Sequence, residues 1–403
     1  MTSGSNIDEY AMQVALQVCS STLSSIASLS IIVMILISPK KLTSSYGRII
    51  FGMSFGDVMQ SLAMLTGPFS VFSVNACDWN GFAFVCGSIM VPLYTFALST
   101  RYFCRLNLKM SDERFGRKIE RWIQVVIIMF VLGISITGFV MKLYNPMGSE
   151  AVCYFIEYPI GCLTDPEIYG ECERGMQSHK FIAIVALVFT CSLLGVFINM
   201  TMLCFNSCWI ERVFSNRTHV TTSVFTTASS GHGCFRDYLC CVFCWNYDQL
   251  RQESDSDYVL RLNRMETIIQ SCLYVGAFYI CYLPPVVQSI LIIAAGVRLP
   301  RIILGTISFL YPLGGFFNVM IYTRPKVVRL RHAFPGCSRL KAFLLVLKNG
   351  GEMPDLDNDP NAMNLCPSRR NTSPEDGSET SQISVSERTR TRNHVSMLVS
   401  SFE

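Results

Sequence analysis

Seven long apolar stretches, separated by polar spacers, dominate the pattern of the chain. They cover about residues 10–37, 47–74, 81–108, 121–143, 179–206, 265–294 and 302–323. A helix needs roughly 20 apolar residues to cross the hydrocarbon core of a membrane, and every stretch reaches that length. Strands of a membrane barrel are shorter, roughly 10 residues, and alternate between two faces. The pattern therefore predicts an all-α membrane protein, a seven-transmembrane helix bundle.

Composition supports this assignment. Half of the residues (50%) are hydrophobic, 15% are charged, and the mean hydropathy is +0.36. A water-soluble domain usually carries more charge than this. We expect an integral, multi-pass protein that enters the membrane by the secretory route, with the plasma membrane as its default destination.

Positive charges predict the orientation of the bundle. The spacers after the first, third, fifth and seventh stretches carry Lys and Arg, whereas the loop between the fourth and fifth stretches is acidic. Lys and Arg accumulate on the cytosolic side of membrane proteins. The N-terminus is therefore expected outside the cell and the C-terminus in the cytosol.

This orientation divides the chain into four expected parts. Residues 1–9 are a short extracellular N-terminus, and residues 10–323 are the bundle, with a long third inner loop at about 207–262. Residues 324–345 are a basic juxtamembrane segment. Residues 346–403 are rich in polar residues with few aromatics, so they are expected to be a disordered cytosolic tail.

Four cysteines fall on the predicted outer side: Cys77, Cys153, Cys162 and Cys172. An oxidising compartment favours two disulfides among them, and three pairings are open. We favour Cys77 with Cys153, which would hold the loop over the bundle, and Cys162 with Cys172, a short local closure. Buried or unpaired thiols are the alternative.

The cysteines on the predicted cytosolic side are expected to stay reduced. Cys337 follows the last stretch by about fourteen residues, among basic neighbours, and is a candidate for palmitoylation at the membrane surface. His232 and the cysteines of the third inner loop lack the paired spacing of a zinc site. No metal, no cofactor and no nucleic-acid partner is expected, whereas membrane lipids are.

Short motifs in the sixth and seventh stretches resemble one family. The sixth reads F-Y-I-C-Y-L-P from Phe278 to Pro284, similar to F-x-x-C-W-x-P with Tyr282 in place of Trp. The seventh reads N-V-M-I-Y from Asn318 to Tyr322, similar to N-P-x-x-Y with Val in place of Pro. Both motifs resemble those of G protein-coupled receptors.

The outer loop sharpens the resemblance. It contains Cys153-Tyr154, then Tyr158-Pro159-Ile-Gly161-Cys162, then Cys172-Glu-Arg174-Gly175. This is similar to the C-W…P-x-G-C…C-x-R-G pattern of receptor-like proteins in diatoms, which are distant relatives of the slime-mould cyclic-AMP receptors. The resemblance covers the chain from the second stretch to Pro325 and implies a seven-helix receptor with a heterotrimeric G protein as partner.

Asp57, in the second stretch, is similar to the single buried acid of that superfamily. An ionisable group inside a membrane is costly, so Asp57 is expected to face the bundle interior with Asn318 as its polar partner. A bound sodium ion, a protonation switch and a purely structural hydrogen bond are the interpretations left open.

Arg101 and Tyr102 resemble the last two residues of D-R-Y, with Thr100 in place of the acid. Arg101 lies about 36 Å along its helix from Cys77, at a rise of roughly 1.5 Å per residue, so it is expected near the inner membrane face. We predict an ion pair with Glu266 at the foot of the sixth stretch. A snorkelling arginine that only marks the interface is the alternative.

A switch is expected in the sixth stretch, around Phe278, Cys281 and Tyr282. Pro284 removes a backbone donor inside the helix, so the helix is expected to bend there and its inner half can swing. Asn318 and Tyr322 are four residues apart and share one helix face.

The predicted function is therefore a G protein-coupled receptor that transmits an unknown extracellular ligand to a heterotrimeric G protein. A non-coupling membrane sensor and a small-solute transporter are the alternatives, and no enzyme motif is present. Residues expected to line the ligand site are Tyr94, Tyr282, Gln288 and Tyr311. The seventh stretch contains no lysine, so a retinal Schiff base is excluded.

Overall fold

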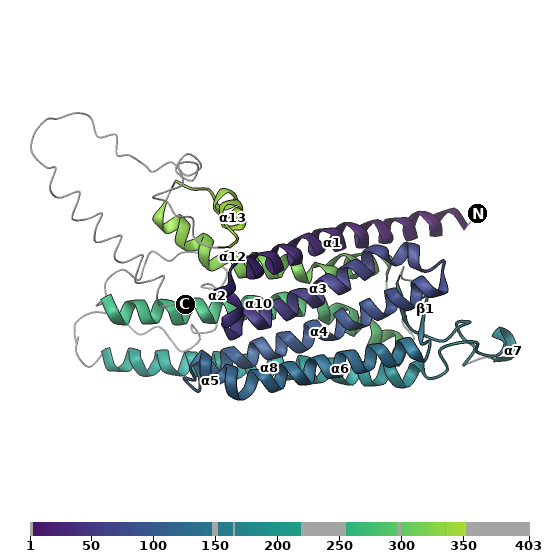
Figure 1. Ribbon diagram of the computed structural model, residues 1–403, viewed down its shortest axis with the longest axis horizontal. Coiled ribbons are helices and arrows are strands. Elements are labelled where there is room, and N and C mark those ends of the chain that lie inside the picture. Colours follow the sequence, from purple (N-terminus) through teal and green to yellow (C-terminus); the bar gives the residue numbers. More distant parts are fainter. Residues whose placement is uncertain are drawn as a thin grey trace, which may run out of the picture.

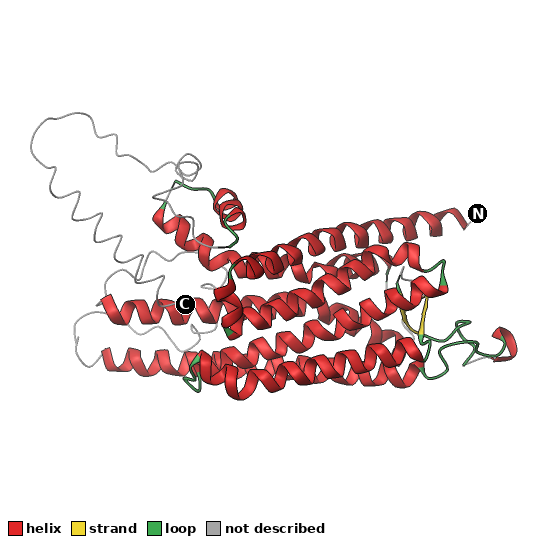
Figure 2. Ribbon diagram, viewed as in Figure 1, coloured by secondary structure: helices red, strands yellow, loops and turns green. Residues whose placement is uncertain are grey.

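The computed structural model describes residues 3–146, 152–163, 166–218, 255–295, 300–334 and 336–351. Within these ranges, seven helices are long and apolar enough to cross a membrane. Their spanning parts are Tyr10–Ile37, Ser45–Ser70, Val74–Leu106, Asp112–Val140, Ser178–Met202, Glu266–Gln288 and Ile302–Arg331. The long helices run side by side along one axis (Figure 1), and almost all of the described chain is helical (Figure 2). The prediction of an all-α seven-helix bundle is confirmed.

The helices of the bundle are α1 (Ser3–Ile37), α3 (Ser45–Ser70), α4 (Val74–Leu106), α6 (Arg121–Val140), α8 (Ser178–Thr218), α10 (Asp255–Ala295), α11 (Arg301–Leu310) and α12 (Gly314–Ala333). Shorter elements are α2 (Pro39–Thr43), α5 (Asp112–Phe115), the π-helical turn η1 (Gly116–Glu120), α7 (Pro166–Tyr169), the 3-10 turn η2 (Tyr311–Leu313) and α13 (Arg339–Lys348). Strands β1 (Tyr144–Pro146) and β2 (Cys153–Phe155) form an antiparallel pair. We call the end of the bundle with β1 and β2 the hairpin end, and the opposite end the α5 end (Figure 1).

Helices α8 and α10 extend beyond the apolar stretches. The long loop expected at 207–262 is shorter, because α8 continues to Thr218 and α10 begins at Asp255. Loss of hydrophobicity does not end a helix, whereas Gly and Pro do, and neither residue occurs in 203–218 or 255–264. Residues 219–254 lie outside the described residues, as do 352–403, which make up most of the disordered tail expected at 346–403. The first residues of that expected tail are instead helical, because α13 ends at Lys348.

The last spanning helix is interrupted in its hairpin-end half. Helix α11 ends at Leu310, η2 contains Pro312, and α12 begins at Gly314. Pro312 cannot donate a backbone hydrogen bond, so the α-helical ladder breaks there.

The basic juxtamembrane segment expected at 324–345 contains the end of α12 and the first part of a separate helix. No break separates Asn318 from Ala333, although Pro325 lies between them. The separate helix is α13, which packs back on α12 through a small apolar cluster. Its buried members are Val327, Leu330, Cys337, Ala342, Leu345 and Val346.

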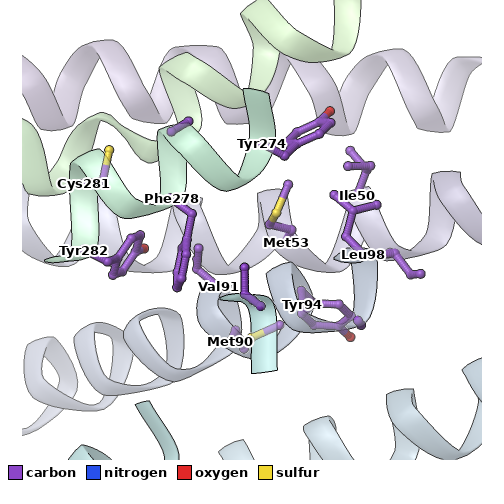
Figure 3. Close-up of a cluster of buried hydrophobic side chains, with 14 of the residues drawn as sticks. Ile50, Met53, Met90, Val91, Tyr94, Leu98, Tyr274, Phe278, Cys281 and Tyr282 are labelled. Carbon is purple, nitrogen blue, oxygen red and sulfur yellow. The ribbon is translucent and has the colours of Figure 1, made fainter. Parts of the chain in front are cut away.

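The centre of the bundle is a continuous apolar core contributed by most of the spanning helices. Figure 3 shows Ile50 and Met53 from α3 and Met90, Val91, Tyr94 and Leu98 from α4 near Tyr274, Phe278, Cys281 and Tyr282 from α10. Helices α8 and α6 contribute least, since only 17% and 22% of the most apolar windows of their spans are buried within the protein. The remaining side chains of α6 face outward, as expected for a helix in contact with lipid.

Candidate functional site

Tyr282 lies at the centre of the predicted switch. The hydroxyl group donates a hydrogen bond to Oε1 of Gln60 on α3 at 2.8 Å. The ring stacks on Phe278 at a centroid distance of 5.0 Å and meets Tyr311 edge-on at 5.3 Å. Tyr282 is 1% exposed, so it holds α10 against α3 and η2 and does not line an open cavity.

Asp57 and Asn318 meet in the bundle interior, as the sequence analysis expects. The Asn318 amide donates to Oδ2 of Asp57 at 2.7 Å, and Asp57 is 4% exposed. Gly314 lies close enough that a Cβ atom there would be 3.2 Å from Oδ1 of Asp57. A glycine at this position lets α12 approach the carboxylate closely.

Several buried polar atoms of α1 and α3 have no hydrogen-bond partner within the described chain. They are the Oγ atoms of Ser21, Ser28 and Ser54 and the Nε2 atom of Gln60. Other serines of α1 do bond: Ser24 accepts from the Gly315 backbone at 3.1 Å, and Ser25 donates to Ser61 at 2.8 Å. Small polar residues thus bring α1, α3 and α12 together, as is common in membrane bundles.

We expect Asn318→Ala to lower the free energy of unfolding by about 1–3 kcal/mol, because the buried Asp57 would lose its hydrogen-bond donor. The measurement is the thermal unfolding temperature in detergent. Asn199→Ala is the matched control, since Asn199 donates only to the neutral hydroxyls of Ser99 and Thr100, each at 3.1 Å. Equal losses in both variants would contradict a special role of the Asp57 contact.

Arg101 does not reach Glu266, so the predicted ion pair between them is wrong. Its guanidinium donates to Oδ1 of Asp112 through Nη2 at 2.8 Å and through Nε at 3.0 Å. Oδ2 of Asp112 accepts from the Ser45 backbone at 3.2 Å, and the guanidinium lies over the ring of Tyr46 at 5.2 Å. Arg101 pairs with Asp112 and not with Glu266 because Asp112 begins α5, the helical turn that follows α4, and therefore lies beside Arg101.

Glu266 has a different partner from the predicted one. Its Oε2 atom lies 3.8 Å from Nη2 of Arg329 on α12. This ion pair joins the α5-end halves of α10 and α12. Tyr322 also belongs to this region, where its ring stacks with Tyr46 at 6.2 Å.

The hairpin closes the opposite end of the bundle. Disulfides join Cys77 with Cys153 and Cys162 with Cys172, which are the two pairings that the sequence analysis favours. The Cys153 backbone donates to Oδ1 of Asn80 at 3.2 Å. The loop is thus attached to the first turns of α4 by one covalent and one hydrogen bond.

Arg174 and Gly175 secure the second half of the loop. Arg174 forms an ion pair with Asp78 and donates through Nε to the Lys142 carbonyl at 3.4 Å. Gly175 has φ +77°, and a Cβ atom there would lie 2.3 Å from the Ile156 carbonyl oxygen, so only glycine fits. The R-G part of the loop pattern therefore has a structural explanation.

Strand β2 inserts into the bundle. Val152 and Phe155 are buried, and the Tyr154 ring meets Phe84 of α4 at 5.8 Å. Burial raises the pKa of Tyr154 to about 12, because its apolar surroundings disfavour the charged phenolate. The hairpin covers the space beneath it with its own side chains.

The residues expected to line a ligand site do not form one group. Tyr94 is 4% exposed and packs on Gly52, where a Cβ atom would lie 2.3 Å from Cζ of Tyr94. Gly52 lies about two turns from the start of α3 at the α5 end, so the expected position of Tyr94 near the hairpin end is wrong. Tyr94 lies about 30 Å along α4 from Val74, at 1.5 Å per residue. This distance already indicates a position beyond the middle of the helix. Tyr311 and Gln288 are half-buried in the hairpin-end halves of their segments.

Cys337 is not available as an acyl anchor in this structure. It is 2% exposed within the cluster between α12 and α13, and its sulfur forms a disulfide. A buried, oxidised sulfur cannot accept an acyl chain, so the structure disagrees both with the palmitoylation prediction and with the expectation that this cysteine stays reduced. The position of Cys337 shortly after the last apolar stretch predicted an exposed side chain, but the packing of α13 on α12 buries it.

The sequence analysis did not identify three residues of the site: Gln60, Asp112 and Tyr46. Gln60 lies one helical turn beyond Asp57 within an apolar stretch, and its polarity there was a usable signal. Asp112 is an acid among the basic residues of the loop after α4, eleven positions from Arg101. Tyr46 carries no signal in the sequence, because only the fold brings its ring beneath the guanidinium.

A scan against protein-family models finds no match to the chain, and a search of curated proteins finds no significant one.

Proposed function

We propose that the chain is a G protein-coupled receptor that transmits an extracellular ligand to a heterotrimeric G protein through movement of α10. A series of ring contacts between the hairpin and α10 carries this proposal. Tyr154 meets Phe84 at 5.8 Å, Phe84 meets Tyr311 at 6.3 Å, and Tyr311 meets Tyr282 at 5.3 Å. The stacked pair of Tyr282 and Phe278 completes the series inside α10. A displacement of the hairpin is thereby coupled to the centre of α10 through aromatic packing.

The two prolines of α10 favour movement of the segment that these rings contact. Pro284 and Pro285 follow Tyr282 directly and remove two backbone donors from the helix. A ligand that binds one arrangement of the rings better than another shifts the equilibrium between two orientations of α10. The ion pair between Glu266 and Arg329 favours the orientation in which α10 contacts α12.

The α5 end would receive the G protein. Arg101 is held by Asp112 and stacked over Tyr46, so it is unavailable until this arrangement opens. Release of Arg101 from Asp112 would present a cation to a partner between α4 and α10. The hairpin end then faces the outside of the plasma membrane, and a small ligand would enter beneath the hairpin near Tyr311 and Gln288.

The test is GTP exchange by a panel of heterotrimeric G proteins with the full chain in nanodiscs. We expect Asp112→Asn to raise basal exchange severalfold, because an amide holds the guanidinium less strongly than a carboxylate. Arg101→Ala should abolish exchange. Glu171→Gln is the control, since this exposed acid at the hairpin end has no ion-pair partner in the described chain; it should leave exchange unchanged.

A small-solute transporter is the second candidate, and the unpaired oxygens of Ser21, Ser28 and Ser54 favour it. Buried polar atoms of α1 and α3 that lack a protein partner could be solvated by water or by a polar solute. Absence of exchange with every G protein, together with solute uptake into liposomes that contain the chain, would replace the receptor proposal with this one.

A further inference from the structure

A cavity of about 630 Å³ opens at the α5 end, between the first turns of α3 and the segment formed by α5, η1 and α6. It takes no part in the ring contacts or in the Asp57 pair. Charged side chains line most of it, and it lies at the start of the fourth candidate span, Asp112–Val140.

Two of the lining carboxylates are already compensated. Glu120 accepts from Nε of Arg48 at 2.7 Å and from Nη2 of Arg48 at 2.6 Å. Asp112 is bound by Arg101. Gly116 permits the first of these pairs, because a Cβ atom there would be 3.2 Å from Oε2 of Glu120 and 3.3 Å from Nη2 of Arg48.

Three other lining side chains form no ion pair with any residue that the structure describes. They are the exposed Arg117, Arg121 and Glu113. The cavity therefore offers two free cations and one free anion. A ligand of matching charge would carry two anionic groups and one cationic group.

An apolar stripe on α6 leads from the cavity into the membrane. Arg121 is followed on the same helix face by Val125, Ile128 and Leu132, at spacings of three and four residues. These side chains are 54%, 45% and 40% exposed. Trp122, next to Arg121, is 71% exposed, and tryptophan is enriched where a helix meets the lipid headgroups.

We propose that the cavity binds phosphatidylserine in the leaflet at the α5 end. The lipid phosphate and carboxylate would bind Arg117 and Arg121, and its ammonium would bind Glu113. The acyl chains would lie along Val125, Ile128 and Leu132. A soluble phosphate compound would satisfy the arginines but leave this stripe uncovered, and phosphatidylglycerol would leave Glu113 without a cationic partner.

The test uses the full chain purified in detergent and doped with phosphatidylserine, phosphatidylglycerol, phosphatidylethanolamine or phosphatidylcholine of identical acyl chains. Bound lipid is counted by native mass spectrometry. We expect phosphatidylserine to be retained preferentially, and Arg117→Gln with Arg121→Gln to reduce its retention by at least about tenfold. Glu113→Gln should abolish the preference over phosphatidylglycerol.

Arg114→Gln with Lys118→Gln is the matched control, because it removes the same charge from exposed residues that do not line the cavity. Retention should fall less than in the Arg117/Arg121 variant, and equally for phosphatidylserine and phosphatidylglycerol, since only diffuse attraction to anionic lipid is lost. An equal loss of phosphatidylserine retention in the two double variants would overturn the proposed site, because nonspecific surface charge would then explain the binding. Displacement of the lipid by equimolar glycerophosphoserine would overturn the role of the apolar stripe. If the Arg117/Arg121 double variant does not purify, the two single variants provide the same comparison.

Discussion

Gly87→Leu is expected to prevent assembly of the bundle. Gly87 lies where α4 crosses α3, and a Cβ atom there would be 2.5 Å from both the Gly56 carbonyl oxygen and the Gln60 backbone nitrogen. Both neighbours belong to the backbone, so no change of rotamer can make room. Overpacking that only rotates side chains costs about 1–3 kcal/mol, and a forced separation of two helices should cost more. The same displacement would move Gln60 away from Tyr282.

Gly133→Leu provides the control for this prediction. Gly133 lies on α6, and nothing is within 4 Å of the position that its Cβ atom would occupy. We expect this variant to fold normally, because the new side chain points into lipid and leucine favours a helix over glycine. The measurements are the yield of monodisperse protein and its thermal unfolding temperature in detergent. Normal folding of Gly87→Leu would refute the close crossing of α3 and α4.

Loss of the disulfide between Cys77 and Cys153 should have the second-largest effect. The bond closes a segment of 76 residues, whereas the bond between Cys162 and Cys172 closes 10. The chain-entropy relation assigns about 4.5 kcal/mol to the longer closure and about 2.7 kcal/mol to the shorter one. The longer closure also holds β2 against α4 and α8. Its loss would uncouple Tyr154 from Phe84, and through Phe84 from Tyr311.

The variants are Cys77→Ser with Cys153→Ser, compared with Cys162→Ser with Cys172→Ser. Both remove one disulfide from the hairpin end, but only the first frees β2. We expect a larger fall in unfolding temperature in the first double variant. Residues 152–155 should also exchange their amide hydrogens faster in that variant, because β2 is no longer held in place. The reverse order of stability would contradict the role assigned to Cys153.

Interactions that follow from chemistry and compartment were predictable. The disulfides paired as favoured because Cys77 begins α4 and only Cys153 lies in the part of the loop that reaches it. Asp57 met Asn318 because a buried carboxylate requires a donor, and few donors occur in apolar stretches. In both cases the number of available partners was small.

Interactions for which the sequence offers many possible partners could not be predicted from residue types alone. Arg101 had several acids within reach along the chain, and depth alone pointed to Glu266, whereas the turn after α4 placed Asp112 nearer. The position of Tyr94 along its helix was assigned too near the hairpin end. Cys337 was expected at the surface because nothing in the sequence indicates that α13 folds back on α12.

The sequence by itself determined the all-α bundle, its seven spanning helices and the residues that could bond inside it. Apolar length and the scarcity of intramembrane polar groups are sufficient for this, because each segment must satisfy its own backbone hydrogen bonds in lipid. The tertiary structure alone decided which ion pairs form, where β2 inserts, and that three uncompensated charges share one cavity. Such features depend on distances between segments far apart in the chain, and the polarity of single residues carries no information about those distances.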